Sequence, residues 1–467
     1  MKHIHFIGIG GAGLSAIALI LLEQGFTVSG SDRERTALFE TITAAGAQTF
    51  LGHVPQHIEG ADLVIRSSAI PDDNPEVVAA QAGGIPVIKR QAFLGELTAG
   101  KHTLAVAGTH GKTTTTAMLA WILYQMELDP SYISGGIVSQ LGGNAHAGTG
   151  SYFVIEADEY DHMFLGLAPK MAIITNIEHE HADFFPTAAE YHEAFKAFTR
   201  CIQPDGKLLL CLDDPGIRSL LSELPSLREK SLTYGTGANV QYSAEEITTV
   251  EGYPQFELIF HNPIRKKVNL GTINLHVPGH HNVLNATGAL AVVHQLGLSL
   301  DAARQAIQAF TGADRRFEVV GQVDGVTIIN DYGHHPSEIA ATLEAAHSRY
   351  PEHRVWAVWQ PHTFSRTQAL ADRFIDALAL ADKVMILKIF AAREVDPGQS
   401  AEQFVQAFPV KKAVYASTFD FAAESLIKNL LPGDVVIVFS AGDAIKLSQM
   451  LLQRLQRRET DRQEVNP

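Results

Sequence analysis

A glycine-rich turn lies between a short apolar segment, residues 103–107, and a stretch with helical character. The residues of the turn are Gly108, Thr109, His110, Gly111, Lys112, Thr113 and Thr114. A strand, a glycine turn and a helix start gather backbone N–H groups around one point, where they can hold phosphate oxygens. The lysine adds a positive charge, and the hydroxyl after it can bind Mg²⁺. The turn therefore predicts a nucleoside triphosphate site, although Val106 stands where the full P-loop pattern has glycine, and an ordinary strand-to-helix turn is the alternative.

The 467-residue chain is too long for a single hydrophobic core. Apolar strand-like segments alternate with helical segments in most of the sequence, which is typical of doubly wound parallel sheets. Residues 231–277 differ, because they alternate in the Thr- and Val-rich manner of an antiparallel appendage, and residues 454–467 look frayed. We predict three α/β domains in series: a Rossmann-like domain (1–99), a P-loop-type ATPase domain carrying the appendage (100–312), and a second Rossmann-like domain (313–467).

The composition narrows the classes of partner. A formal net charge of −15 argues against broad binding to nucleic acid or to an anionic membrane, since a phosphate backbone needs a positive face. Cys201 and Cys211 are not spaced as a redox or metal pair, which favours buried reduced thiols. No apolar run approaches the ~20 residues that span a bilayer. We expect a cytoplasmic protein without membrane insertion, a monomer or weak homodimer.

A second glycine cluster lies near the N-terminus, again between a strand and a helix. Gly8, Gly10 and Gly13 form the pattern G-x-G-x-x-G, and Asp32 ends the next strand. Such a loop places a diphosphate on a helix N-terminus, and the acidic residue can bind ribose hydroxyls. NAD is the plain interpretation, but a UDP-sugar offers the same diphosphate next to a sugar.

Acidic residues and histidines follow two strands of the predicted middle domain. Glu156 ends one strand and precedes Asp158 and Glu159, while His179, Glu180 and His181 follow the next. Carboxylates at neighbouring strand ends of a P-loop-type sheet can hold Mg²⁺ near a triphosphate. Zinc competes for the histidine-rich cluster, and solvation of the surface explains Asp158 and Glu159 equally well.

Further polar clusters lie after residue 278. Asn282 and Asn285 lie one helical turn apart at a helix start, which suits hydrogen bonds to adenine, although capping explains one of them. The other clusters contain Arg315, Arg316, Asp331, Tyr332, His334, His335, His362 and Arg366. The residues from Asp331 to His335 follow one predicted strand, and His362 and Arg366 follow another. Each of these two groups precedes a helix, so both should line a ligand crevice at the carboxyl ends of the strands.

In this order, the motifs resemble those of the Mur ligases of peptidoglycan synthesis. The segments that carry the resemblance are G-I-G-G-x-G, S-S-A-I, G-T-H-G-K-T-T-T, E-A-D-E, T-N-I-E, P-G-x-H-N-x-x-N-A, R-R-F-E, D-Y-G-H-H-P and Q-P-H-x-x-x-R-T. They extend from Ile7 to the run at 441–443, and they are most similar to the branch that attaches L-alanine to UDP-N-acetylmuramate. The resemblance implies an ATP- and Mg²⁺-dependent ligase in which the carboxylate is activated as an acyl phosphate and the three domains close around their substrates.

The resemblance also implies site residues. The UDP-sugar would be held by Gly8, Gly10, Gly11, Gly13, Asp32, Ser67 and Ser68. ATP would be held by residues 108–114, with Asn282 and Asn285 at adenine, Asp331 at ribose and Arg316 at the γ-phosphate. Mg²⁺ would be bound by Thr113, Glu156 and His181. The amino acid would be bound by Tyr332, His334, His362 and Arg366. The catalytic residues would be Lys112, Arg316 and His334, the last as acceptor of the amine proton.

Four positions depart from the pattern of the Mur ligase family. Glu180 replaces a usual aspartate, Asn330 a frequent aspartate, Thr363 an arginine of some members, and Lys388 a common acidic residue.

Three other functions are alternatives to the L-alanine ligase. The nearest is the family's recycling ligase, which attaches a preformed tripeptide to the same UDP-sugar. The others are an NAD-dependent dehydrogenase, which leaves Lys112 unexplained, and a non-catalytic nucleotide switch, which leaves the C-terminal histidines unexplained.

Overall fold

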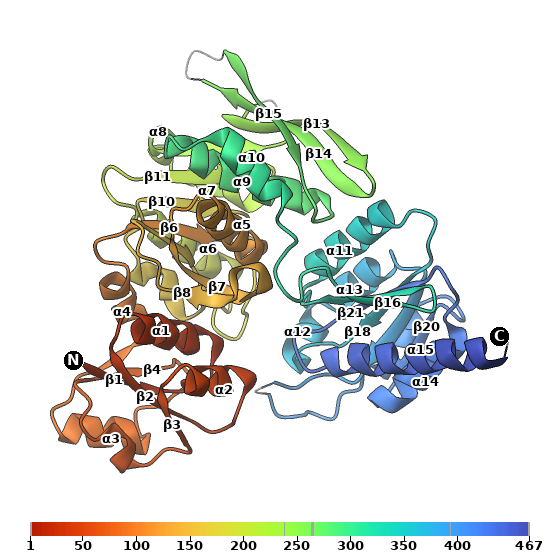
Figure 1. Cartoon of the computed structure of the whole chain (residues 1–467), viewed down its shortest axis with the longest axis horizontal. Coiled ribbons are helices and arrows are strands. Elements are labelled where there is room, and N and C mark those ends of the chain that lie inside the picture. Colours follow the sequence, from red (N-terminus) through yellow and green to blue (C-terminus); the bar gives the residue numbers. More distant parts are fainter. Residues whose placement is uncertain (1, 238, 263–265, 393, 466–467) are drawn as a thin grey trace. The chain divides into compact units, whose positions relative to one another are not determined.

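The computed structural model describes residues 2–237, 239–262, 266–392 and 394–465, with side chains up to residue 460 (Figure 1). The chain divides into two compact units. Unit 1 comprises residues 1–246, 256–273 and 284–310, and unit 2 comprises residues 247–255, 274–283 and 311–467. The strands form three separate sheets of five, ten and six strands. The predicted α/β class with parallel sheets is confirmed.

The first sheet is parallel throughout and has the strand order β3-β2-β1-β4-β5. Its strands are β1 (His3–Ile7), β2 (Thr27–Asp32), β3 (Gln48–Leu51), β4 (Leu63–Arg66) and β5 (Val87–Lys89). The helices of this part are α1 (Ala12–Glu23), α2 (Ala37–Ala44), η1 (Pro55–Ile58), α3 (Pro75–Ala82) and α4 (Arg90–Leu97). The strand order reverses at β1, and such a switch point opens a ligand crevice at the carboxyl ends of the strands. The N-terminal glycine cluster follows β1 and so lies at this crevice.

The second sheet has the order β15-β14-β13-β12-β11-β10-β6-β9-β7-β8. Its first strands are β6 (His102–Ala107), β7 (Ser131–Val138), β8 (Gly143–His146), β9 (Tyr152–Glu156), β10 (Met171–Ile174) and β11 (Lys207–Cys211). The helices are α5 (Lys112–Gln125), η2 (Ser139–Leu141), η3 (Tyr160–Gly166), α6 (Ala188–Thr199), α7 (Pro215–Glu223), α8 (Leu227–Lys230), α9 (His280–Gln295) and α10 (Leu300–Gln308). Strand β6 lies between β9 and β10 and is parallel to both. The carboxyl ends of these three strands therefore meet where the predicted phosphate turn begins.

The prediction that residues 231–277 form an antiparallel appendage is wrong for the first strand of that segment. Strand β12 (Ser231–Gly235) pairs parallel to β11 and also parallel to β13 (Tyr242–Val250), so it extends the parallel sheet. Strands β13 and β14 (Tyr253–His261) are joined by two residues with positive φ, a connection that only antiparallel neighbours allow. Strand β15 (Lys267–Asn274) completes the sheet. The antiparallel part therefore begins at β13, because the alternating pattern does not reveal the direction of a strand.

The third sheet, in unit 2, has the order β16-β17-β21-β18-β19-β20, and only β16 is antiparallel to its neighbour. Its strands are β16 (Glu318–Val323), β17 (Val326–Asp331), β18 (Val355–Trp359), β19 (Lys383–Leu387), β20 (Ala413–Ala416) and β21 (Val435–Phe439). The helices are α11 (Pro336–Arg349), α12 (Phe364–Ala369), α13 (Ala371–Leu378), η4 (Ala401–Ala407), α14 (Phe419–Asn429) and α15 (Ile445–Val465). Side chains of β18 alternate between two cores: Ala357 and Trp359 pack with α11 and α13, whereas Trp356 and Val358 pack with α14 and α15. Both faces of the sheet are therefore covered by helices, as a doubly wound fold requires.

The expectation that residues 454–467 are frayed is wrong up to Val465, because α15 continues through them. Leu447, Leu451 and Leu455 are fully buried at a spacing of four residues and pack against α14. Arg458 in the next turn donates from Nε to Asp324 Oδ2 at 2.5 Å. The many charged residues of this segment make its helical pattern hard to recognise in the sequence, and packing of the buried leucines stabilises the helix.

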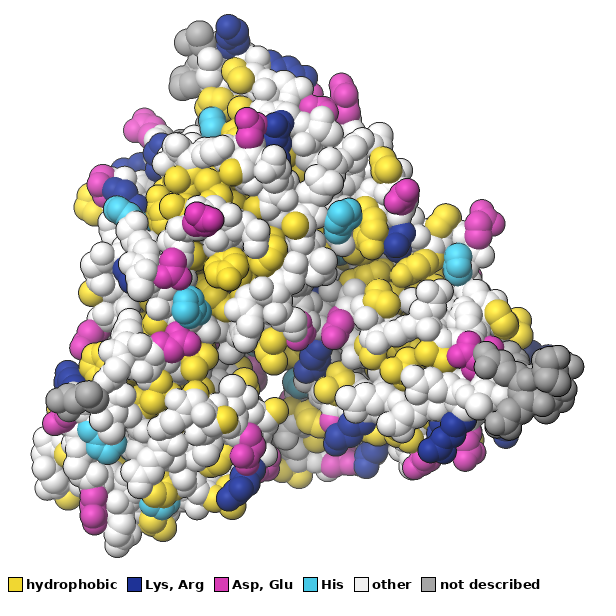
Figure 2. Space-filling view, in the orientation of Figure 1, with side chains coloured by type: hydrophobic (Ala, Val, Ile, Leu, Met, Phe, Trp, Pro, Cys, Tyr) yellow, Lys and Arg dark blue, Asp and Glu magenta, His cyan; other side chains and the backbone are white. Residues whose placement is uncertain are grey.

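No described helix combines the length and the unbroken apolar character needed to cross a lipid bilayer. On the face that Figure 2 shows, acidic side chains (magenta) and basic side chains (dark blue) are interspersed with one another. The excess of negative charge is therefore not gathered into one acidic region on that face.

Candidate functional site

The N-terminal glycine cluster forms the turn between β1 and α1. The N–H groups of Gly8 and Ile9 both donate to the carbonyl oxygen of Ser31, at 2.8 and 3.1 Å. The Gly10 N–H donates to Oδ2 of Asp32 at 2.9 Å. The φ of Gly8 is +91°, a conformation that side chains disfavour. Asp32 therefore fastens the glycine turn to the end of β2, in addition to any ligand it binds.

The two serines that follow β4 border the same crevice. The Ser67 N–H donates to the Ile7 carbonyl oxygen at 3.0 Å, and a Cβ atom on Gly8 would lie 3.1 Å from the Ser67 Cβ. The Ser68 hydroxyl donates to the carboxylate of Asp161, in η3. The predicted residues of the first glycine cluster and of S-S-A-I are thus brought together at the ends of β1, β2 and β4.

Arg90 belongs to this site, and the sequence reasoning missed it. Its guanidinium lies so close to Gly13 that a Cβ atom there would overlap it. Its Nη2 is 3.5 Å from Oδ2 of Asp158, and burial lowers the pKa of Arg90 although this carboxylate opposes the shift. Arg90 directly follows β5, so a cation at a strand end beside the glycine turn was the available signal. Its charge is placed where a diphosphate on the turn could meet it.

The phosphate turn joins β6 to α5, and Lys112 is the first residue of α5. The φ values of Gly108 and Gly111 are +137° and +80°. Lys112 Nζ donates to the Gly108 carbonyl oxygen at 2.6 Å and to Glu159 Oε2 at 2.9 Å. Lys112 is thereby folded back over the start of the turn.

Lys112 and Glu159 form a buried ion pair. Burial alone would lower the pKa of Lys112, but Glu159, Asp158 and Glu156 outweigh it and raise that pKa. Burial would likewise raise the pKa of Glu159, but Lys112 and His181 lower it to about 2. Tyr191 OH also donates to Glu159, at 2.9 Å. Both members of the pair are therefore charged at neutral pH.

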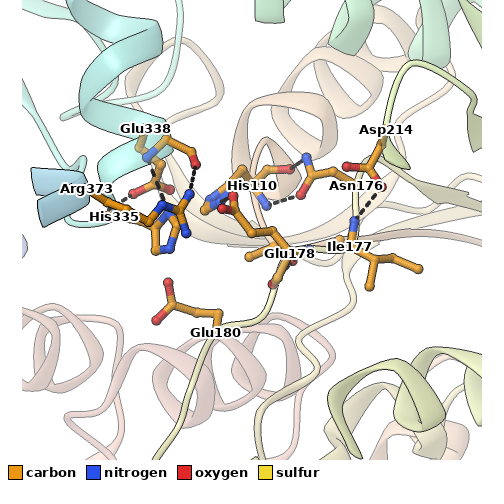
Figure 3. Close-up of polar contacts among 12 residues, drawn as sticks. His110, Asn176, Ile177, Glu178, Glu180, Asp214, His335, Glu338 and Arg373 are labelled. Carbon is orange, nitrogen blue, oxygen red and sulfur yellow. Dashed lines mark hydrogen bonds and ion pairs between the residues drawn. The ribbon is translucent and has the colours of Figure 1, made fainter. Parts of the chain in front are cut away.

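The remaining residues of the turn are held by the segment after β10. The Thr109 hydroxyl donates to the Glu178 carbonyl oxygen at 2.8 Å. His110 is fixed twice by Asn176, which accepts from the His110 N–H at 2.8 Å and donates to the His110 carbonyl oxygen at 3.0 Å (Figure 3). The motif T-N-I-E thus holds the phosphate turn in place by hydrogen bonds.

The predicted Mg²⁺ ligands fall into two contacts. The Thr113 hydroxyl donates to Glu156 Oε1 at 3.1 Å, and the Gly135 N–H donates to Glu156 Oε2 at 2.6 Å. Burial raises the pKa of Glu156, although Lys112 opposes the shift. His181 Nε2 lies 3.5 Å from Glu159 Oε1, and Asp158, Glu159 and His181 offer ligand atoms within 4.8 Å of one another. Thr113 and Glu156 thus form one contact at the start of α5, whereas His181 belongs to a second cluster, with Asp158 and Glu159.

The two asparagines of α9 have different neighbours. Asn285 lies beside the phosphate turn, because a Cβ atom on Gly111 would be 2.6 Å from its Oδ1. Asn282 donates from Nδ2 to the Pro278 carbonyl oxygen at 2.7 Å, so it holds the loop before the helix. Both side chains are buried.

In unit 2, Tyr332 directly follows β17, and two arginines that precede β16 lie beside its ring. The carboxylate of Asp331 accepts from the N–H groups of Phe317 and Gly333 at 2.9 and 2.7 Å, and burial raises the pKa of Asp331 to about 6. The guanidinium carbons of Arg315 and Arg316 each lie 4.9 Å from the centre of the Tyr332 ring. Asp331 therefore fixes the loop that carries the two arginines.

The histidines and Arg366 continue this cluster. His334 Nδ1 is 3.3 Å from Glu338 Oε2, and Arg316 Nη1 is 3.7 Å from Glu338 Oε1. The rings of His334 and His362 are 6.0 Å apart, and Arg366 Nη1 donates to His362 Nδ1 at 3.1 Å. The carboxyl ends of β17 and β18 thus gather all the predicted amino-acid-binding residues of unit 2.

Two of the four departures have local explanations. Asn330 Oδ1 accepts from the Ser448 hydroxyl at 2.5 Å, which ties β17 to α15. Thr363 has φ +66° and caps α12, its Oγ1 accepting from the Arg366 N–H at 3.4 Å. Glu180 is buried, and Lys388 is exposed after β19.

Three family models match the chain in succession. The model "Mur ligase family, catalytic domain" matches residues 3–102, "Mur ligase middle domain" matches 106–293, and "Mur ligase, glutamate ligase domain" matches 315–442. The chain therefore belongs to the Mur ligase family, and it carries three Mur ligase domains in series.

One relative and two solved structures show which members of the family the chain is similar to. A UDP-N-acetylmuramate–L-alanine ligase of Desulforamulus reducens is 40% identical over 462 residues, which cover 97% of this chain and 98% of the relative. The crystal structure of a UDP-N-acetylmuramate–alanine ligase from Thermotoga maritima is similar with a TM-score of 0.81 and 28% identity, covering 98% of this chain and all of that one. A murein peptide ligase from Psychrobacter arcticus is similar with a TM-score of 0.69 and 26% identity, covering 98% and 99%.

Proposed function

We propose that this chain joins L-alanine to UDP-N-acetylmuramate with conversion of ATP to ADP and phosphate. The observation that carries the proposal is the similarity to a ligase of that name at 40% identity over 97% of the chain. The gathering of Lys112 with the phosphate turn, and of His334 with His362 and Arg366, supports the same chemistry. We expect the reaction to take place in the cytoplasm.

The proposed first step activates the carboxylate of the UDP-sugar, because oxide is too poor a leaving group for an amine to displace. The carboxylate attacks the γ-phosphorus of ATP, ADP leaves, and an acyl phosphate forms. Lys112 and Arg316 would disperse the negative charge that spreads over the phosphoryl oxygens in this transfer. Asn285, beside Gly111, would hold the nucleotide against the turn.

The donor set around Thr113 fits a hard divalent cation. Burial raises the pKa of the Glu156 carboxyl, and a nearby cation would act in the opposite direction, because it favours the charged form. We propose that Thr113, Glu156 and His181 hold Mg²⁺. When bound, this ion would withdraw charge from the phosphate oxygens.

The proposed second step is attack of the L-alanine amine on the acyl phosphate, with release of phosphate. The amine must be neutral, so a base must take its proton. His334, oriented by Glu338 at 3.3 Å, would accept that proton. Arg366 would bind the alanine carboxylate, and its bond to His362 holds it in position.

One assay tests the function. Purified protein is incubated with ATP, Mg²⁺ and UDP-N-acetylmuramate, and ADP release is measured after addition of L-alanine or of the cell-wall tripeptide. We expect ADP release with L-alanine and formation of the UDP-linked alanine amide. ADP release with the tripeptide alone would assign the recycling activity instead, and no release with either would contradict both.

Arg90 gives a test of the UDP-sugar site, which we assign to the glycine turn, Asp32, Ser67 and Ser68. Replacing Arg90 with alanine should raise the KM for UDP-N-acetylmuramate about 10- to 100-fold, since a charge-assisted hydrogen bond contributes about 1.5–3 kcal/mol. The KM for ATP should stay unchanged. Steady-state rates at varied concentrations of each substrate measure both effects.

Lys89 is a matched control for this substitution, because it is the exposed neighbour of Arg90 and lies 3.8 Å from Asp161. Lys89→Ala should leave the KM for the UDP-sugar near that of the wild type. An equal rise in both variants would show a general electrostatic effect and remove Arg90 from the binding site.

A further inference from the structure

A cavity of about 300 Å³ opens at the carboxyl edge of the third sheet, entirely within unit 2. It is lined by Gln360, by Leu387, Lys388, Ile389, Phe390 and Ala391 after β19, by Ala416, Ser417, Thr418 and Phe419 after β20, and by Asp443. This volume lies at the lower end of the range of small-molecule sites. Nothing assigned above uses the cavity.

The topology explains why a cavity forms there. The chain leaves β19 toward η4, which packs on the same core as α11 and α13. It leaves β20 toward α14, which packs on the opposite core. Neighbouring strands whose connections depart to opposite faces form a switch point, where ligand crevices open in α/β sheets.

Phe390 belongs both to this cavity and to the amino-acid end proposed above. Its ring stacks on that of His362, with centroids 5.8 Å apart and an interplanar angle of 22°. Its backbone is fixed on both sides, because the Phe390 N–H donates to the Pro361 carbonyl oxygen at 2.8 Å and the Thr363 N–H donates to the Phe390 carbonyl oxygen at 2.9 Å. A Cβ atom on Gly442 would lie 2.6 Å from the ring, so that glycine leaves room for it. The ring is therefore held against His362 while it also lines the cavity.

The described lining of the cavity does not include His334, His362 or Arg366. Phe390 both lines the cavity and stacks on His362, and the lining beyond it is mixed: Leu387, Ile389, Ala416 and Phe419 are apolar, whereas Lys388 and Asp443 are charged. Removing the ring would join this partly apolar cavity to the place where the amino acid is proposed to bind.

We propose that Phe390 is a specificity-determining residue that restricts the amino-acid substrate to a small side chain. The ring acts as a partition between the amino acid and the cavity, so that a methyl group is accepted and a branched aliphatic side chain is excluded. Without the ring, the cavity would receive the side chain of L-valine or L-leucine. This inference rests on the proposed function, since it assumes that Arg366 and His334 receive the amino acid.

The test compares wild type, Phe390→Ala, Phe390→Leu and Phe390→Tyr. For each, kcat/KM is measured with L-alanine, L-valine and L-leucine at saturating ATP and UDP-N-acetylmuramate. One methylene group in an apolar pocket changes kcat/KM by about 10-fold or more. We expect the ratio of L-leucine to L-alanine to rise at least about 10-fold in Phe390→Ala, to rise less in Phe390→Leu, and to stay near the wild-type value in Phe390→Tyr. Phe421→Ala, a half-exposed aromatic on α14, is the control for loss of a ring elsewhere.

An unchanged ratio of L-leucine to L-alanine in Phe390→Ala would overturn the proposal. If the unchanged ratio comes with an equal loss for every amino acid in Phe390→Ala and Phe390→Leu, while the melting temperature is retained, the ring only positions His362. Failure of the wild type to use L-alanine would instead contradict the proposed function itself, and it is seen before any variant is compared.

Discussion

Replacing Lys112 with alanine is expected to abolish ADP formation, with a fall in kcat of about 10³-fold or more. The substitution removes the cation that we propose to meet the γ-phosphate at the phosphate turn. It also leaves Glu159 buried without its partner, and breaking a buried pair in this way destabilises a protein by about 3–5 kcal/mol. Coupled measurement of ADP release and chemical unfolding detects both effects.

A double variant separates catalysis from stability. In Lys112→Ala, Glu159→Gln, the unpaired buried charge is gone, so much of the lost unfolding free energy should return while activity stays absent. Return of activity together with stability would show that Lys112 serves the fold and not the phosphoryl transfer.

Replacing Arg316 with alanine should lower kcat about 10²- to 10³-fold with little change in melting temperature. Arg316 lies beside Tyr332 and Glu338 and retains a partly exposed side chain, so its removal leaves no buried carboxylate without a partner. A single preorganised charge that meets the transferring group contributes rate of this order. The measurement is the steady-state rate at saturating substrates, together with thermal unfolding.

Arg315 supplies the matched comparison, since its guanidinium lies at the same distance from the Tyr332 ring. It donates to the carbonyl oxygens of Ser440 at 2.5 Å and Gly442 at 3.3 Å, and it therefore holds loops together. Arg315→Ala should lower the melting temperature more than Arg316→Ala. Equal effects of the two substitutions on rate and stability would contradict the assignment of Arg316 to the γ-phosphate.

The family and the α/β class could be predicted from the sequence, and both are confirmed. The reason is local: a glycine turn between a strand and a helix is a contiguous pattern, and polar residues after parallel strands share one edge of a sheet. His334, His362 and Arg366 are brought together by this rule alone. The ligand roles given to these residues stay predictions.

What the sequence did not reveal depends on partners distant in the chain. Glu159 was as easily a solvated surface residue as a functional one, and only its burial against Lys112 distinguishes the two. Arg90 follows a strand in the sequence, but only the fold shows that its guanidinium lies against Gly13. The direction of β12 and the helical tail were mistaken because strand direction and long-range packing leave no mark on local periodicity.

The surroundings of the phosphate turn have a consequence for the ionic form of the nucleotide. Lys112 is already neutralised by Glu159, and the carboxylates of Glu156 and Asp158 also act on it. A triphosphate without a counterion would bring further negative charge to this acidic locus and be repelled. We therefore expect the free nucleotide to be a far weaker ligand than its complex with a divalent cation.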